Sequence, residues 1–539
     1  MDPTHAHRPI EIAFEAARDH ADPEGSLRLD LIVEPPSGRT LRLPAYRVDG
    51  RRWAARYASG EIGRHTYVSA CSDRSDAGLH GVEGTVEVEP YTGDNPLYAH
   101  GPLRISSSGR HFEHDDRTPF FWLGDTWWMG LCRRLRWPEE FAELAEDRRR
   151  KGYTVVQIVA GLYPDMGAFD ERGANEAGFP WEEDWRRIRP EYFDMADRRI
   201  ERLVATGIVP CIVGAWGYYL SWLGHRKMQQ HWRYLIARWA AYPVVWCVAG
   251  EANLPWYLAP GFPYDDRPAV TGWTEIAGYV RQLDPYRRPL SIHPTGLGRL
   301  SARGSIDDQG LLDFDMLQTG HGDRDSLGPT VDTLRWSYQA EPRMPVLNSE
   351  VTYEGILGRC HDDVQRLMFW TSILNGACGH TYGANGIWQM NGTETPYGAS
   401  PHGGTYGPTP WREAMTLPGS MQLAWARRLL ERYRWWEMEP LPDTADYAEG
   451  LIARDDWHRP HAARIGDDLR IIYAPQAHRL RLRGLEGATW RATAWEPANG
   501  AEAHLGPIDA TDGCAELSRP FTPDVLQPEQ DWLLILERA

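Results

Sequence analysis

The chain has 539 residues, of which 25% are charged and 42% are hydrophobic, and these values are typical of a globular protein rather than a disordered or fibrous one. Its formal net charge of −17 argues against nucleic acids and anionic membranes as partners, because both bind basic surfaces. The 25 Trp outnumber the 12 Phe, and this excess suggests flat aromatic faces that bind sugar rings.

Signals for membrane insertion or export are not visible in the sequence. No run of about 18 apolar residues predicts a transmembrane helix, and the first residues lack the basic and apolar regions of a signal peptide. A secreted chain without its leader would look the same. The seven Cys are far apart and form no C-x-x-C pair, which favours reduced thiols. We therefore expect a cytoplasmic protein, and its association into a homo-oligomer is left open.

Residues 1–100 are expected to form an all-β domain. Residues 11–15, 27–33, 41–43 and 84–88 alternate apolar and polar side chains with a period of two, and turn residues lie between them. Several short strands of this kind predict a small β-sandwich.

Residues 101–442 show a different pattern, in which short apolar runs alternate with longer amphipathic stretches. This alternation is typical of βα units. Eight strands are predicted, at Phe120–Gly124, Val155–Val159, Ile208–Val213, Val244–Ala249, Pro289–His293, Phe314–Gln318, Pro345–Asn348 and Gly376–Tyr382. Eight such units predict a (β/α)8 TIM barrel. No glycine-rich dinucleotide motif or P-loop follows a strand, which disfavours a doubly wound sheet.

Residues 443–539 return to a β pattern, with apolar strands at 469–473, 488–495 and 531–536 and turns rich in Gly and Pro between them. They predict a second β-sandwich. The fold class is therefore α/β, a TIM barrel with an N-terminal and a C-terminal β-sandwich domain.

Two glutamates follow apolar strands of the predicted barrel. Glu251 comes after the run at 244–249, and Glu350 after the run at 345–348. Catalytic residues of a TIM barrel lie at the C-terminal ends of its strands, and glycoside hydrolysis needs two carboxyl groups. The apolar strands and nearby Trp246 and Trp256 could raise the pKa of one acid, as a proton donor requires. The alternative is that each Glu caps a strand or pairs with an Arg.

Other polar and aromatic residues near the predicted strand ends are candidates for binding substrate. They are Asp125, Trp128, Trp216, Asn253, His293, Gln318, His321, His380, Tyr382 and Trp388. Each has a structural alternative: a helix cap for the aspartate, a satisfied hydrogen bond for each histidine, and packing for about half of the tryptophans. The three histidines follow different strands, which argues against a zinc site. We expect no metal and no organic cofactor.

Several of these segments resemble one family. Phe120–Trp128 resembles the first-strand signature of the apiosidase-like (DUF4038) barrel hydrolases, Pro345–Gly355 resembles their seventh-strand motif, and Gly379–Gly383 with Gly386–Trp388 resembles their eighth. Tyr46–Trp53 with Gly63–Tyr67 is similar to the DUF5060 sandwich that often precedes this barrel. The C-terminal stretch is similar to the small β-domain that closes such chains.

The resemblance implies a retaining glycoside hydrolase with Glu251 as acid/base and Glu350 as nucleophile. One departure is that Gly250 stands where the wider clan has an asparagine that contacts the sugar 2-hydroxyl, and Asn253 is available for that role. Apiosidases proper can carry Asp in place of Glu251, and this difference leaves sugars other than apiose open as the substrate.

The sequence thus predicts an exo-acting glycoside hydrolase that releases one sugar, a pentose or furanose being favoured, from oligosaccharides or small glycosides. The alternatives are a hexose-specific glycosidase and a non-catalytic carbohydrate-binding protein on a hydrolase-like scaffold. A lyase acting on uronic acids needs a basic cluster at the strand ends, and few Arg are found there.

Overall fold

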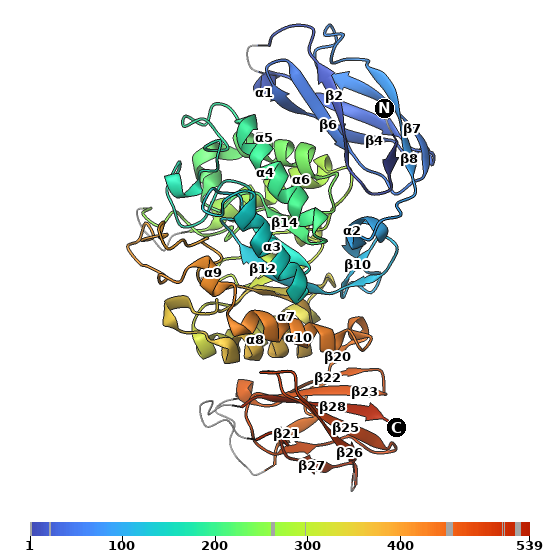
Figure 1. The fold of residues 1–539 in the computed structure, drawn as a ribbon, viewed down its shortest axis with the longest axis vertical. Coiled ribbons are helices and arrows are strands. Elements are labelled where there is room, and N and C mark those ends of the chain that lie inside the picture. The colour runs from blue at the N-terminus through green and yellow to red at the C-terminus, as the bar shows by residue number, and fades with distance from the viewer. Residues whose placement is uncertain are drawn as a thin grey trace.

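A computed structural model describes residues 3–20, 23–259, 265–296, 298–448, 456–508, 510, 512–522 and 530–539. Along its longest axis the molecule consists of three parts, with N-terminal sheets at one end, a barrel in the middle and C-terminal sheets at the other end (Figure 1). The two termini lie in the two outer parts.

The middle part is a barrel of eight parallel strands, in the order β16-β15-β14-β13-β12-β19-β18-β17. Their bounds are β12 Trp122–Trp127, β13 Val155–Val159, β14 Val209–Val213, β15 Val245–Cys247, β16 Leu290–Ser291, β17 Asp315–Gln318, β18 Val346–Glu350 and β19 Ala377–Tyr382. The backbone N–H of Asp313 donates to Leu290 O at 2.8 Å and Ser291 Oγ donates to Phe314 O at 2.7 Å, which joins the first and last strands of the sheet. The predicted TIM barrel is confirmed.

Helices cover the outside of the barrel and follow most of its strands. They are α3 Glu139–Lys151, α4 Pro190–Ala205, α5 Tyr219–Trp239, α6 Arg267–Leu283, α7 Leu327–Gln339, α8 Asp362–Leu374 and α10 Pro418–Leu430. Between β16 and β17 the described residues form 3-10 turns at Ala302–Gly304 and Gln309–Leu311. Strands such as β13 are buried along their whole length, because both faces of a parallel sheet are covered.

A small antiparallel sheet lies against the barrel at the N-terminal ends of its strands. It consists of β9 Leu103–Ile105, β10 Phe112–His114 and β11 Pro119–Phe120. The ring of Phe112 contacts Trp122 at 5.2 Å and Phe314 at 5.1 Å between centroids. Both partners lie at the starts of barrel strands, so this sheet covers the end opposite the predicted active site.

The N-terminal part is a sandwich of two sheets, as predicted. One has the order β1-β8-β7-β3-β4, with bounds Thr4–His5, Glu83–Glu89, Gly63–Cys71, Leu29–Glu34 and Leu41–Pro44. The other has the order β2-β6-β5, with bounds Ile10–Glu15, Arg52–Tyr57 and Tyr46–Asp49. Alternate residues of β2 are buried, which is the period expected of a strand with one face on the core.

A buried ion pair holds this sandwich on the barrel helices. Arg56 of β6 donates to Asp197 of α4 at 2.6 Å, and Arg238 of α5 donates to the same Oδ2 at 2.9 Å. Trp239 Nε1 donates to the other oxygen of Asp197 at 2.6 Å. Because a buried charge is costly unless it is fully paired, this arrangement fixes the orientation of the sandwich.

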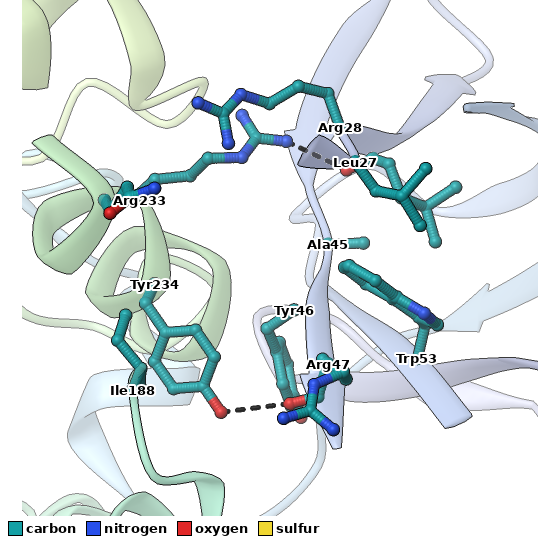
Figure 2. A pocket seen from close by; sticks show the side chains of 11 residues that line it. Leu27, Arg28, Ala45, Tyr46, Arg47, Trp53, Ile188, Arg233 and Tyr234 are labelled. Carbon is teal, nitrogen blue, oxygen red and sulfur yellow. Dashed lines mark hydrogen bonds between the residues drawn. The ribbon is translucent and has the colours of Figure 1, made fainter. Parts of the chain in front are cut away.

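Figure 2 shows a second part of the same interface, where Tyr234 on α5 donates to the backbone oxygen of Arg47 at 3.0 Å and Arg233 donates to that of Leu29 at 2.9 Å. The cavity between these groups holds about 30 Å³, which is room for a water molecule and not for a sugar. The cavity is therefore a gap in the packing between the two parts.

The C-terminal part also contains two antiparallel sheets. One has the order β20-β22-β23-β28-β25-β26, with bounds Glu439–Pro440, His461–Ile465, Leu469–Ala474, Trp532–Arg538, Trp490–Trp495 and Glu502–Pro507. The other has the order β21-β24-β27, with bounds Ala445–Tyr447, Leu480–Leu482 and Ala515–Leu517. The short strand β20 joins this sheet by pairing with β22. The division at about 100 and 442 stays a prediction.

The C-terminal sheet packs on α8. Arg366 of α8 pairs with Asp531 at 3.0 Å, and Tyr473 donates to the same carboxylate at 3.1 Å. Trp370, one turn along the helix, stacks on Tyr473 and contacts Trp495 edge-on at 5.7 Å.

Asp125 does not end a strand. We placed the end of the first barrel strand at Gly124, but β12 continues to Trp127, so Asp125 lies inside it. Its carboxylate accepts from Arg148 of α3 at 2.6 Å and from Trp127 Nε1 at 2.7 Å, and both charged side chains are fully buried. The residue therefore connects the strand to the helix outside the barrel, and this corrects our expectation that it binds sugar hydroxyls.

Replacing Arg148 should reveal the cost of that buried charge. In Arg148→Met the Asp125 carboxylate loses its counter-ion, so we expect the free energy of unfolding to fall by about 3–5 kcal/mol in denaturant titration. The double variant with Asp125→Asn should recover most of the loss. Arg149→Met, which breaks the exposed pair with Glu146, should leave stability almost unchanged, because an exposed ion pair is screened by water. Equal effects of the two single variants would contradict the argument.

Candidate active site

The barrel brings Glu251 and Glu350 to one end of the sheet. Glu350 is the last residue of β18, and Gln318, the last residue of β17, lies beside it in register. Gln318 Nε2 reaches over to donate to Glu251 Oε1 at 3.0 Å, just beyond the end of β15. The residue beside Glu350 on the neighbouring strand therefore hydrogen-bonds to Glu251, which places the two predicted glutamates at the same end of the barrel.

The backbone of Glu251 is in an unusual conformation. Its φ is 39°, in the left-handed region that residues with a side chain seldom adopt. Such strain is found at functional sites, where the surrounding structure holds it in place. Here Trp216 Nε1 donates to Glu251 Oε2 at 3.2 Å, so each carboxylate oxygen has its own donor.

Trp216 also explains why a glycine precedes Glu251. A Cβ atom on Gly250 would lie 2.3 Å from the indole ring of Trp216, so no larger residue fits there. The two residues form a parallel β-bridge, which continues the pairing of β14 and β15 as far as the site. The space next to the backbone at Gly250 is thus occupied by an indole that hydrogen-bonds to the acid itself.

Glu350 is contacted by two histidines. His321 Nε2 donates to Oε1 at 2.8 Å. His293 Nε2 lies 3.2 Å from Oε2, at an angle outside hydrogen-bond geometry. His293 Nδ1 lies 2.9 Å from the carbonyl oxygen of Pro294 and donates to it, because a carbonyl oxygen can only accept. If Nε2 also carries a proton, the imidazole ring is a cation that faces the carboxylate of Glu350.

The surroundings drive the pKa values of the two acids in opposite directions. Burial raises the pKa of Glu251 to about 7, and the charge of Glu350 adds to the rise. Burial would also raise the pKa of Glu350, but contact with His293 and His321 holds it well below its usual range. At neutral pH one carboxyl can hold a proton while the other is ionised.

Aromatic residues form the wall around Glu350. Trp128 Nε1 donates to Tyr353 Oη at 2.9 Å, and its ring contacts Trp216 at 5.5 Å and His293 at 5.6 Å. Trp388 stacks on Tyr353 at 6.2 Å. Trp128, Trp216 and Trp388 are all buried and pack around the residues at this end of the barrel, and their contact with sugar stays a prediction.

Two loops contribute residues that the sequence analysis did not name. Asp165, in the loop after β13, accepts from Ser400 and, at 3.4 Å, from Tyr406, both in the loop after β19. Burial raises the pKa of Tyr406, and also that of Tyr257, which lies in a third loop, after β15. The charge of Glu251 raises both pKa values further, so both phenols stay neutral beside the acid. The only signal in the sequence was the aromatic, Gly- and Pro-rich composition of these loops.

Three further candidates lie elsewhere. His380 packs on Phe369 of α8 at 5.5 Å between ring centroids, and burial lowers its pKa to about 3. Tyr382 donates to Glu354 at 2.5 Å. Asn253 donates weakly to Ser305 O at 3.4 Å. We expected these residues to contact sugar, but the two on β19 face the outer helices, and the asparagine is turned toward a neighbouring loop.

The three candidate histidines do not come together at one point of the described structure. His293 and His321 both turn to Glu350, while His380 faces a helix. Among the described residues no group of three or more His, Cys, Asp or Glu side chains is placed to hold a metal ion.

None of the helices in the described part of the chain has the length and apolar character that a membrane span requires.

Known proteins resemble this chain in sequence pattern and in fold. The model of the apiosidase-like catalytic domain matches residues 106–437, more than half of the chain. A putative glycoside hydrolase from Bacteroides vulgatus has a TM-score of 0.70 and 17% identity over 100% of both chains. A glycoside hydrolase family 5 protein from the same organism has a TM-score of 0.65 and 22% identity over 83% of this chain and 95% of its own.

A third solved structure, described as a glycoside hydrolase, has a TM-score of 0.64 and 22% identity over 83% of this chain and 99% of its own. At these identities the likeness shows a shared fold. No curated protein sequence matches the chain.

The buried carboxyl group of Glu354 allows a test of how strongly burial raises a pKa in this barrel. Burial raises its pKa from 4.5 to about 7, so the folded state binds more protons than the unfolded state between those values, and stability should fall as pH rises through them. Above about pH 7 the cost reaches about 3 kcal/mol. We expect Glu354→Gln to be more stable than the parent at pH 8 and similar at pH 4.5 in denaturant titration. The same pH dependence in both proteins would contradict this pKa.

Proposed function

The chain belongs to the apiosidase-like family of glycoside hydrolases, and on this premise we propose that it hydrolyses glycosides with Glu251 as acid/base and Glu350 as nucleophile. The observation that carries the proposal is the pair of buried carboxyl groups at the end of the barrel: Gln318 and Trp216 hydrogen-bond to one, and His293 and His321 contact the other. These surroundings move the pKa values of the two acids in opposite directions. Glycoside hydrolysis requires this separation of roles, one carboxyl protonated and one ionised at the same pH.

In the first step Glu350 attacks the anomeric carbon, and Glu251 gives its proton to the leaving oxygen as the glycosidic bond breaks. A glycosyl ester on Glu350 results. In the second step Glu251, now ionised, removes a proton from water, whose oxygen attacks the same carbon and releases Glu350. Each step transfers one proton and requires no redox partner.

The contacts of Glu350 favour retention over inversion. An inverting enzyme needs its second carboxylate to take a proton from water, whereas a retaining enzyme needs it to bond to carbon and to leave again. A carboxylate held in its ionised form by His293 and His321 is a weak base. It is therefore better suited to act as nucleophile and leaving group.

The charges around the site favour a neutral sugar. Asp165 adds a third carboxyl beside the two glutamates, and the charged groups that act most strongly on Glu251 are Glu350 and the two histidines. Among the described residues no arginine is one of the groups that act most strongly on Glu251, so the carboxylate of a uronic acid would meet the charge of Glu350 there without a guanidinium partner. A pentose or furanose is favoured by the family to which the chain belongs.

The loop contacts favour release of a single terminal sugar. Asp165 holds Ser400, and Arg172 donates to the backbone oxygens of Tyr397 and Ala399 at 3.2 and 3.0 Å. These bonds connect the loop after β13 to the loop after β19 across one side of the barrel end. A site closed on one side accepts a chain end more readily than the middle of a polymer.

Glu350→Gln should abolish turnover of aryl glycosides, by on the order of 10³-fold or more in kcat, because an amide cannot form the ester intermediate. Glu354→Gln, four residues along the chain, is the matched control and should keep its activity. Nuclear magnetic resonance of the first product should show the anomer of the substrate. Unchanged turnover in Glu350→Gln would reject the assignment of the nucleophile, and the opposite anomer would reject retention.

The pH profile offers a second test. Since Glu251 must be protonated to act as acid, kcat/KM should fall above about pH 7. The hydrogen bond from Gln318 favours the ionised form of Glu251, so Gln318→Leu should raise its pKa and shift the basic limb to higher pH. A basic limb that stays in place in this variant, with activity still measurable, would show that another group titrates there.

A further inference from the structure

Two tryptophans are exposed on the outside of the barrel, away from the two glutamates. Trp336 on α7 exposes 53% of its surface, and Trp457, from the C-terminal part, exposes 37%. Most of the described tryptophans are buried or half-buried, so these two are exceptions. An exposed indole leaves a large apolar face in water, and such faces mark binding sites.

The two indoles lie along one face of α7. Trp457 packs against Gly328, where a Cβ atom would lie 3.2 Å from its ring. Its Nε1 donates to Asp332 at 3.2 Å. Gly328, Asp332 and Trp336 are four residues apart, so they share a face of the helix and span two turns, about 12 Å. The row is therefore an indole, a carboxylate and a second indole.

A cavity of about 390 Å³ lies beside Trp336. Its lining is more apolar than polar, with Trp336 and Leu300 among its apolar residues, and its polar groups come from Asp332 and Thr333 of the helix and from Arg299 and Ser301 of the segment between β16 and β17. Arg299 is already engaged, since it pairs with Asp266 and donates to Gly304 O at 2.6 Å. The cavity thus offers an apolar surface beside Trp336 together with a few hydrogen-bonding groups, among them the carboxylate of Asp332.

We propose that this face of α7 is a second carbohydrate-binding site, which takes a neutral oligosaccharide chain. The apolar faces of two sugar rings lie on Trp336 and Trp457, and hydroxyl groups between them donate to Asp332. An anionic glycan is disfavoured because Asp332 repels it. The carboxylate between the indoles also interrupts the apolar surface, which argues against a protein partner that needs a continuous patch. The α7 helix leads into β18, so a bound chain lies on the same barrel as the active site.

Affinity electrophoresis in gels that contain a soluble polysaccharide tests this site. The probes are arabinan, xylan, glucomannan and hydroxyethyl cellulose as neutral chains and polygalacturonate as an anionic one, with Glu350→Gln as the parent so that no probe is cleaved. We expect at least one neutral polymer to retard the parent, and Trp336→Ala and Trp457→Ala to weaken that retardation tenfold or more. Ile62→Ala, which removes an equally exposed side chain from the N-terminal sandwich, should migrate as the parent does.

The two tryptophan variants in the otherwise unchanged enzyme should hydrolyse small aryl glycosides at the parental kcat/KM, which separates this site from the active site. Equal retardation of parent and variants, no retardation by any neutral polymer, or retardation by polygalacturonate alone would each overturn the proposal. Failure of Glu350→Gln to lose turnover would affect only the proposed function. Size-exclusion chromatography at the same concentrations would reveal self-association through the indoles, which would also overturn the proposal.

Discussion

The rest of the site depends on how the charge of one buried carboxylate is compensated. Glu350 lies at the end of a strand that is buried along its whole length, where an isolated charge would be prohibitively costly. His321 and His293, which follow different strands, approach its two oxygens and keep it ionised. The charge that remains then helps to keep a proton on Glu251. The contact of two histidines with Glu350 thus sets the protonation state of both glutamates.

The contacts that set the pKa values of Glu350 and Glu251 require a rigid frame, because they act over distances of about 3 Å. The frame is built from the barrel strands and from buried contacts outside them. Asp125 and Arg148 hold β12 to α3, and Asp197 and Asp531 hold the two outer parts on the helices. The strained backbone at Glu251 is supported by the packing of Trp216 against Gly250. The charged side chains far from the site therefore serve it indirectly, by fixing the elements that carry it.

Much of this could be predicted from local patterns. Apolar runs of four to six residues between amphipathic helices identify parallel strands, and strand ends of a barrel meet at one rim whatever the sequence separation. For that reason Glu251, Glu350, Gln318 and His321 could be grouped before any contact was known. The resemblance to the family rested on segments of the same strands.

The sequence by itself determined the barrel, the flanking β-sandwiches and the positions of the two glutamates. The strands and helices follow from the local spacing of apolar residues, and each glutamate directly follows an apolar strand. Only the tertiary structure decided which side chains face inward. A parallel strand buried on both faces carries no alternation of polar and apolar residues, so Asp125, His380 and Tyr382 could be read as lining the site when they face the helices. The contact between Asp165 and Ser400 joins loops 235 residues apart, and no local pattern records it, since loop composition indicates where a chain turns and not what it touches.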